Sequence, residues 1–286
     1  MSSKWNKTQT MYKIGLLLLG IVALSYGLKG CREPCDRSER NELRNKLERR
    51  AARLIDTIVL SNYSVYQERF PRLFAENASM CITARRDLGC YDGLDHILGY
   101  TALVDPNVGE LIQYWSWRLY RSTVDTKERT VQFLTEWDFY SYQTGQNYTV
   151  TSHLYFSFDC DNKITYYAAL SDNIVYVQAE MPPISDHNIT RICQGGPRRP
   201  DLPYMSGIQE ACVGEYQVYA SIAECEAFLS SIPVENDAVP FGTGNSVGCR
   251  DWHLGMARVD PATHCSHVGP TGGGKCCDPG HCDHMM

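Results

Sequence analysis

The last 75 residues of the chain gather most of its metal-binding and redox-active side chains. Seven of the thirteen cysteines and five of the eight histidines lie there. Cys249 and His253 are one helical turn apart, and His264, Cys265 and His267 follow after Pro261. Such nitrogen and sulfur donors suit tetrahedral zinc. The same density also suits a set of disulfides, and the spacing matches no standard zinc-finger pattern.

The rest of the sequence favours the disulfide interpretation. Residues 1–28 combine lysines with an apolar run that is short for a membrane span, so we expect a signal peptide or a retained signal anchor. Four sequons follow, at Asn62, Asn77, Asn147 and Asn188. Thiols are normally oxidised in the secretory pathway. We therefore predict a secreted, extracellular or lumenal glycoprotein, anchored to a membrane only if the N-terminal segment is not cleaved.

The disulfide candidates fall into two groups. Cys81 and Cys90 flank a turn and form a reasonable local pair, whereas Cys31 and Cys35 are too close for a relaxed bridge. Cys160 and Cys193 pair with each other or with other cysteines. In the C-terminal group the pairing stays open among Cys212, Cys225, Cys249, Cys265, Cys276, Cys277 and Cys282, with one cysteine left over.

Disulfides would leave three histidines of the C-terminal region available. These are His253, His264 and His267. They either bind zinc or copper without a cysteine ligand, or they pack and form hydrogen bonds to the loop backbone. We expect no other cofactor.

The charge balance excludes nucleic acid as a partner. The chain has 27 Lys and Arg against 33 Asp and Glu, for a formal net charge of −6, and binding to phosphates needs clustered basic residues. The one basic cluster, residues 44–53, alternates with acids at helical spacing and predicts a solvated helix face. No second hydrophobic segment indicates a membrane.

A stretch rich in proline and glycine, residues 181–206, divides the chain and predicts a linker without a regular helix. Beyond it, residues 207–286 have little apolar sequence, so this module needs covalent cross-links. We expect one helix capped by Ser221 and another capped by Ser246. A loop is expected over residues 264–274.

The segment before the linker, residues 36–180, has the pattern of helices followed by hairpins. An apolar stripe begins at Ser38, and a second helix is expected over residues 94–101. Strand-like alternation follows near residues 111–119, 131–139, 148–158 and 164–170. This order predicts an α+β fold with helices packed on one face of a curved antiparallel sheet.

Three motifs in this segment resemble NTF2-like, or SnoaL-like, domains over roughly residues 40–180. Residues 69–79 are similar to their helix-to-strand joint and residues 93–100 to their next helix. Residues 156–164 resemble their last hairpin, with Asn162 where glycine is usual. The resemblance implies a cone-shaped α+β fold with a cavity. The family includes cyclases, isomerases, dehydratases and many non-enzymatic modules.

Acid–base candidates occur on two of the expected strands. Asp138 and Tyr140 share one strand face, and His153 lies on the next strand, where it could meet Asp138 across the ladder. Such a pair would suit a lyase or isomerase acting on a small hydrophobic substrate. The preferred alternative is a binding or structural module, since polar strand faces more often meet solvent or a partner. That partner could be a small hydrophobic ligand, another protein, or a second copy docked on the sheet face.

Overall fold

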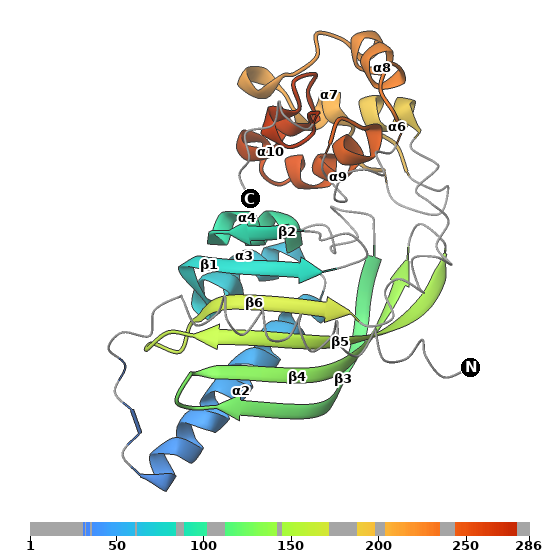
Figure 1. Cartoon of the computed structure of the whole chain (residues 1–286). Helices are drawn as coiled ribbons and strands as arrows, with labels where there is room; N and C mark the ends of the chain where they lie inside the picture. The colour runs from blue at the N-terminus through green and yellow to red at the C-terminus, as the bar shows by residue number, and fades with distance from the viewer. Residues whose placement is uncertain are drawn as a thin grey trace, which may run out of the picture.

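The computed structural model of the chain describes residues 31, 33–34, 36–60, 62–83, 89–101, 112–141, 145–171, 188–197, 204–234 and 244–278. The expected signal segment lies outside these residues. None of the described helices is both long and apolar enough to span a membrane. Figure 1 shows a sheet with helices, the first module (residues 31–171), and a group of short helices beyond one end of it, the second module (residues 188–278).

The first module is built on one sheet of six described strands. They are β1 (Phe74–Thr83), β2 (Gly89–Asp92), β3 (Ile112–Asp125), β4 (Thr130–Ser141), β5 (Gln146–Phe158) and β6 (Ile164–Ser171), in the order β2-β1-β6-β5-β4-β3. Neighbouring strands are antiparallel except β1 and β6. The predicted antiparallel sheet is therefore mixed, because the chain crosses from β1 through α4 and β3 before β6 returns beside it.

Three helices cover one face of this sheet (Figure 1). They are α2 (Arg37–Val59), α3 (Tyr63–Leu73) and α4 (Leu94–Thr101). The predicted stripe of α2 is buried at Leu47, Ala51, Leu54 and Ile58, and it packs with alternate residues of β4 and β5. The predicted α+β fold with helices on one face of a curved sheet is confirmed.

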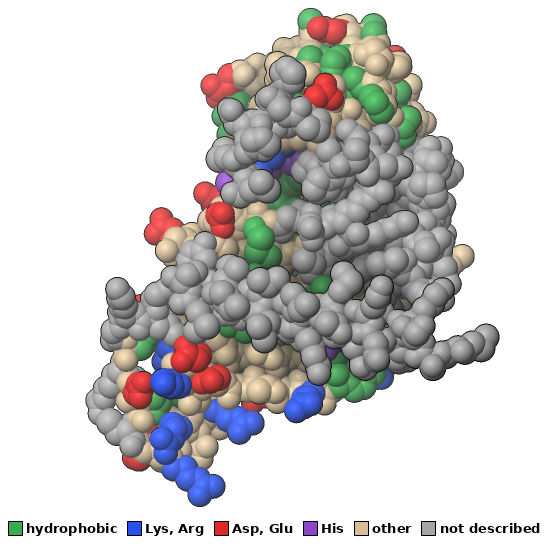
Figure 2. Space-filling model, in the orientation of Figure 1, with side chains coloured by type: hydrophobic (Ala, Val, Ile, Leu, Met, Phe, Trp, Pro, Cys, Tyr) green, Lys and Arg blue, Asp and Glu red, His purple; other side chains and the backbone are tan. Residues whose placement is uncertain are grey.

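The exposed side of α2 carries charge of both signs. Figure 2 shows Lys and Arg side chains intermingled with Asp and Glu where α2 lies in Figure 1. Most residues between Arg44 and Arg53 that face away from the core are exposed. This agrees with a solvated helix face.

Short helices with a separate core make up the second module. They are α6 (Ile189–Gln194), α7 (Ile208–Ala211), α8 (Ile222–Ser230), α9 (Val247–Ala257) and α10 (Pro261–Val268). The Ser221 and Ser246 side chains cap α8 and α9 as predicted. The prediction that residues 181–206 carry no regular helix is wrong at α6. There the Asn188 side chain caps the first turn, and Cys193 joins the second core.

A loop was also expected where the structure has α10. Pro261 suggested the end of a helix, but Pro261 occupies the first turn of α10, where its missing N–H costs nothing. The Asp260 side chain accepts a hydrogen bond from the Thr263 N–H at 3.3 Å and caps this helix. Helix α10 therefore holds His264 and His267 on one face.

Five disulfides join described cysteines: Cys31–Cys160, Cys81–Cys90, Cys193–Cys225, Cys212–Cys265 and Cys249–Cys276. Cys277 is disulfide-bonded as well. The local pair Cys81–Cys90 is confirmed. Cys225 does not pair within the C-terminal group but with Cys193, because α6 packs against α8.

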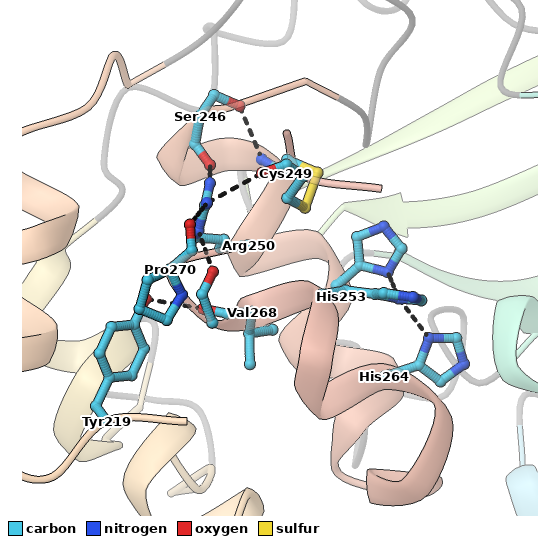
Figure 3. Close-up of a disulfide and its surroundings, with 11 residues drawn as sticks. Tyr219, Ser246, Cys249, Arg250, His253, His264, Val268 and Pro270 are labelled. Carbon is cyan, nitrogen blue, oxygen red and sulfur yellow. Dashed lines mark hydrogen bonds between the residues drawn. A yellow bond between two sulfur atoms is a disulfide. The ribbon is translucent and has the colours of Figure 1, made fainter. Parts of the chain in front are cut away.

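A fully buried arginine organises the second module (Figure 3). The Arg250 guanidinium donates to the backbone oxygens of Ser246, Gly269 and Cys276 at 3.0, 3.2 and 3.0 Å. It also lies 5.0 Å from the centre of the Phe228 ring. These contacts link the start of α9 to the loop that follows α10, because one guanidinium offers five donors in a fixed plane.

Candidate metal centre

Three histidine side chains from two helices converge in the second module. His253 comes from α9, and His264 and His267 come from α10, three residues apart. Figure 3 shows the His253 and His264 rings on the same side of the crossing of these two helices. We call His253, His264 and His267 the histidine cluster. The structure brings together the three residues that the sequence singled out for metal.

The distances within the histidine cluster suit a tetrahedral cation. The His267 Nδ1 atom lies 3.3 Å from Nδ1 of His253 and 3.4 Å from Nδ1 of His264. Each ring offers one nitrogen within 4.8 Å of the others. A tetrahedral zinc site with Zn–N distances of about 2.0–2.1 Å places its nitrogens about 3.3–3.4 Å apart. These two separations therefore match two edges of such a tetrahedron.

Hydrogen bonds alone do not account well for the two short contacts of the His267 Nδ1 atom. The Nδ1 atom of a neutral imidazole carries either one hydrogen or one lone pair. His267 Nδ1 thus shares a single hydrogen between two acceptors, or offers a single lone pair to two donors. A cation at the centre would instead accept three converging lone pairs, so the same geometry serves a metal better than it serves hydrogen bonding.

Burial keeps two of these imidazoles, those of His264 and His267, neutral. His253 and His264 are only 7% and 5% exposed. Loss of solvation lowers the pKa of His264 to about 4, against a weaker opposing effect of Asp260. Loss of solvation, together with the charge of His264, lowers the pKa of His267 to about 4. At neutral pH both rings therefore carry the lone pairs that a metal needs.

The histidine cluster lies where the two modules meet. A Cβ atom on Gly99 of α4 would lie 2.9 Å from His264 Nε2, so a larger residue at this position would displace the His264 ring. That Nε2 atom is buried and has no hydrogen-bond partner among the described residues. Nearby, the Tyr100 and Trp252 ring centres are 6.0 Å apart, and Met256 of α9 packs in the first core.

The predicted acid–base residues lie elsewhere and apart. Asp138, Tyr140 and His153 are on the sheet face opposite the buried one. Asp138 pairs with Thr149, whereas His153 pairs with Leu134, four residues away along β4. The expected contact between Asp138 and His153 across the ladder is not formed, and a catalytic role for these residues stays a prediction.

Local hydrogen bonds hold Asp138 in its ionised form. Its carboxylate accepts from Ser116 Oγ at 2.5 Å and from Thr149 Oγ1 at 2.7 Å. The first of these bonds, then the second, lowers the pKa of Asp138 below its usual value. A carboxylate stabilised in this way is a weaker base.

Four tyrosines on the core side of the first module were missed from the sequence. Tyr91, Tyr100, Tyr114 and Tyr167 come from β2, α4, β3 and β6. Burial raises the pKa of Tyr114 to about 12, and burial followed by the nearness of the other three raises that of Tyr100 well above its usual value. These four hydroxyls therefore stay protonated and lie near one another, on the side where Trp252 approaches.

A bulge in β3 explains the omission of Tyr114. Strict alternation over residues 111–119 would place Trp115, Trp117 and Leu119 on one face, but the register shifts between Tyr114 and Ser116. Trp115 and Leu119 are exposed, while Tyr114 packs against Trp137. One extra residue in a strand reverses the faces of those that follow.

The four sequon asparagines are all exposed. Asn62 and Asn188 also cap α3 and α6, through side-chain oxygens that accept backbone N–H groups. Their solvent exposure is compatible with the predicted glycosylation.

Comparison with solved structures finds proteins that align with about half of the chain. An NTF2-like protein from Exiguobacterium sp. 255-15 is 15% identical over 43% of this chain and 98% of its own, with a TM-score of 0.35. PrhC from Penicillium brasilianum is 11% identical over 48% of this chain and 86% of its own, with a TM-score of 0.38.

Sequence comparisons give a second set of matches. The aurasperone B biosynthesis cluster protein A of Aspergillus niger is 40% identical over 72 residues, 23% of this chain and 22% of the relative. The bifonsecin B biosynthesis cluster protein A of Aspergillus brasiliensis is 39% identical over 72 residues. The match thus spans about a fifth of these relatives. Residues 206–279 fit the model of the BfoA family C-terminal domain, and this segment contains the whole histidine cluster.

Proposed function

We propose that the protein binds a metal ion through His253, His264 and His267. The observation that carries the proposal is the pair of Nδ1–Nδ1 separations, 3.3 and 3.4 Å, within a largely buried group of imidazoles. Imidazole nitrogens suit zinc and copper better than they suit magnesium or calcium, which prefer oxygen. The cation is therefore zinc or copper.

The proposal includes an oxidising compartment. The five disulfides support it, because such bonds persist in secreted and lumenal proteins. The exposed sequons support an extracellular or lumenal glycoprotein. Endoglycosidase treatment of protein secreted from eukaryotic cells should lower its mass. Unchanged mass and retention in the cytosol would contradict this part of the proposal.

Metal binding is tested on the full-length, disulfide-intact chain. After dialysis against a chelator and titration with zinc or copper, elemental analysis should find about one metal per chain. His264→Gln and His267→Gln should each weaken binding by at least tenfold, by analogy with the loss of a supporting ligand. His153→Gln is the matched control, a histidine outside the cluster. Binding that His264→Gln leaves unchanged would refute the proposal.

A second candidate function concerns the first module. Buried tyrosine hydroxyls beside Trp252 favour a site for a small hydrophobic molecule, and the named relatives belong to biosynthetic clusters. Such a module would act as a lyase or isomerase in making a small molecule. The fluorescent probe anilinonaphthalene sulfonate should bind saturably and more weakly to Tyr100→Phe than to Tyr120→Phe. Absence of saturable binding would eliminate this candidate.

A further inference from the structure

A fourth histidine, His96, lies on the face of α4 that meets the second module. Gly99 and Tyr100, three and four residues later, contact His264 and Trp252 respectively. Residues three and four apart share one helix face. His96 therefore lies one turn earlier on the face turned towards α9 and α10.

Tyr63 lies near the first turns of both α4 and α10. Burial raises its pKa, and the negative charges of Asp260, at the start of α10, and of Asp95, beside His96, raise it further. The first turns of α4 and α10 thus lie close to a common residue, which agrees with the position of His96 on its helix.

The His96 ring is already in the tautomer that a metal ligand requires. Its Nδ1 atom lies 2.7 Å from the backbone oxygen of Asp92. A carbonyl oxygen only accepts hydrogen bonds, so Nδ1 carries the hydrogen and Nε2 of the neutral ring carries the lone pair. Metal-binding histidines are commonly oriented by such a bond from the other ring nitrogen.

We propose that His96 Nε2 supplies the fourth ligand to the metal, so that the cation joins the two modules. This inference rests on the proposed metal-binding function. His96 is exposed, and its ring nitrogens are not among the atoms of the histidine cluster that lie within 4.8 Å of one another. When the metal binds, the His96 side chain must therefore turn inward, or α4 must approach α10. The result is a closed four-coordinate site, the type that stabilises structure rather than one that keeps a position open for substrate.

The test compares the full-length wild type with His96→Gln and His96→Ala, and uses His153→Gln as the control. Zinc affinity should fall roughly 10- to 100-fold in both His96 variants and stay unchanged in the control. With cobalt in place of zinc, the visible absorption of the tetrahedral ion should weaken or shift in the His96 variants only. Saturating zinc should raise the melting temperature of the wild type more than that of His96→Gln.

The outcomes separate the two proposals. If the wild type binds zinc while His96→Gln matches it in affinity, cobalt spectrum and melting temperature, another group or water is the fourth ligand and this inference is overturned. The proposed metal-binding function then stands. If the wild type binds neither zinc nor cobalt, the proposed function itself fails, and this inference fails with it.

Discussion

The two modules achieve stable cores by different means. The first has strands of up to 14 residues, joined by backbone hydrogen bonds, around a core of aromatic and aliphatic side chains. In the second module the described helices have no more than 11 residues. The cysteines of at least three disulfides are buried there. Small modules bury too little apolar surface to fold without cross-links. The second module is therefore stabilised by disulfides where the first is stabilised by a hydrogen-bonded sheet.

Removing one disulfide from each module tests this most strongly. Replacing Cys212 and Cys265 with Ala opens a bridge across 53 residues, for which chain entropy predicts about 4 kcal/mol of lost stability. Replacing Cys81 and Cys90 with Ala opens one across 9 residues, worth about 2.5 kcal/mol. Hydrogen–deuterium exchange should show opening of α9 and α10 in the first variant while β4 and β5 stay protected. If the first variant showed equally increased hydrogen–deuterium exchange in both modules, the two modules would not differ in their dependence on disulfides.

The buried arginine should matter nearly as much. Arg250→Met removes the guanidinium hydrogen bonds to the Ser246, Gly269 and Cys276 oxygens. Hydrogen bonds to a charged group contribute about 1.5–3 kcal/mol each. We expect a loss of at least about 3 kcal/mol, measured by urea unfolding. The exposed Arg118, on β3, is the matched control, and Arg118→Met should leave the stability nearly unchanged.

Acid should weaken the second module first. The folded pKa of His264 and His267, about 4, lies below the ordinary value of 6.5, so the unfolded chain binds more protons between these values. Stability from these neutral rings is complete above pH 6.5 and is lost as the pH falls towards 4. For metal-free protein we expect a loss of about 2–3 kcal/mol for each ring in this window.

The double variant His264→Gln, His267→Gln isolates this effect from that of the carboxylates. Its unfolding free energy should vary less with pH between 6.5 and 4 than that of the wild type. Parallel pH profiles for the two proteins would show that the rings are not held neutral by the fold.

The smallest expected change probes the contact between the modules. In Gly99→Ala the new methyl group presses on His264 Nε2, while alanine favours the helix by up to about 1 kcal/mol. We expect nearly unchanged stability without metal and a fall in zinc affinity of about tenfold, equivalent to about 1.4 kcal/mol. Calorimetric titration gives the affinity. Unchanged affinity would show that His264 adjusts freely.

The first module was largely predictable because alternation along β4 and β5 directly encodes which face is buried. The helix caps at Ser221 and Ser246 were also predictable, because a cap depends only on residues close by in the sequence. Prediction failed where distant contacts decide the outcome. The bulge near Trp115 reversed one strand face, and the packing of α6 on α8 joined Cys193 to Cys225.

The site was only partly predictable. Composition singled out His253, His264 and His267, but a loop was expected where Pro261 starts α10, so their common geometry could not be derived. The place of Gly99 and His96 beside them depends on how two modules pack, which local sequence does not encode. Likewise, strand pairing put Asp138 and His153 four residues apart, although their spacing allowed a contact.

The disulfide between Cys31 and Cys160 has a mechanical consequence. Cys160 lies in the turn between β5 and β6, so the chain ahead of α2 is fastened covalently to the sheet. A force applied to the protein through residues before Cys31 would pass into that turn and bypass α2. If the N-terminal segment anchors the protein, tension would load a central hairpin of the sheet before it could unwind the first helix.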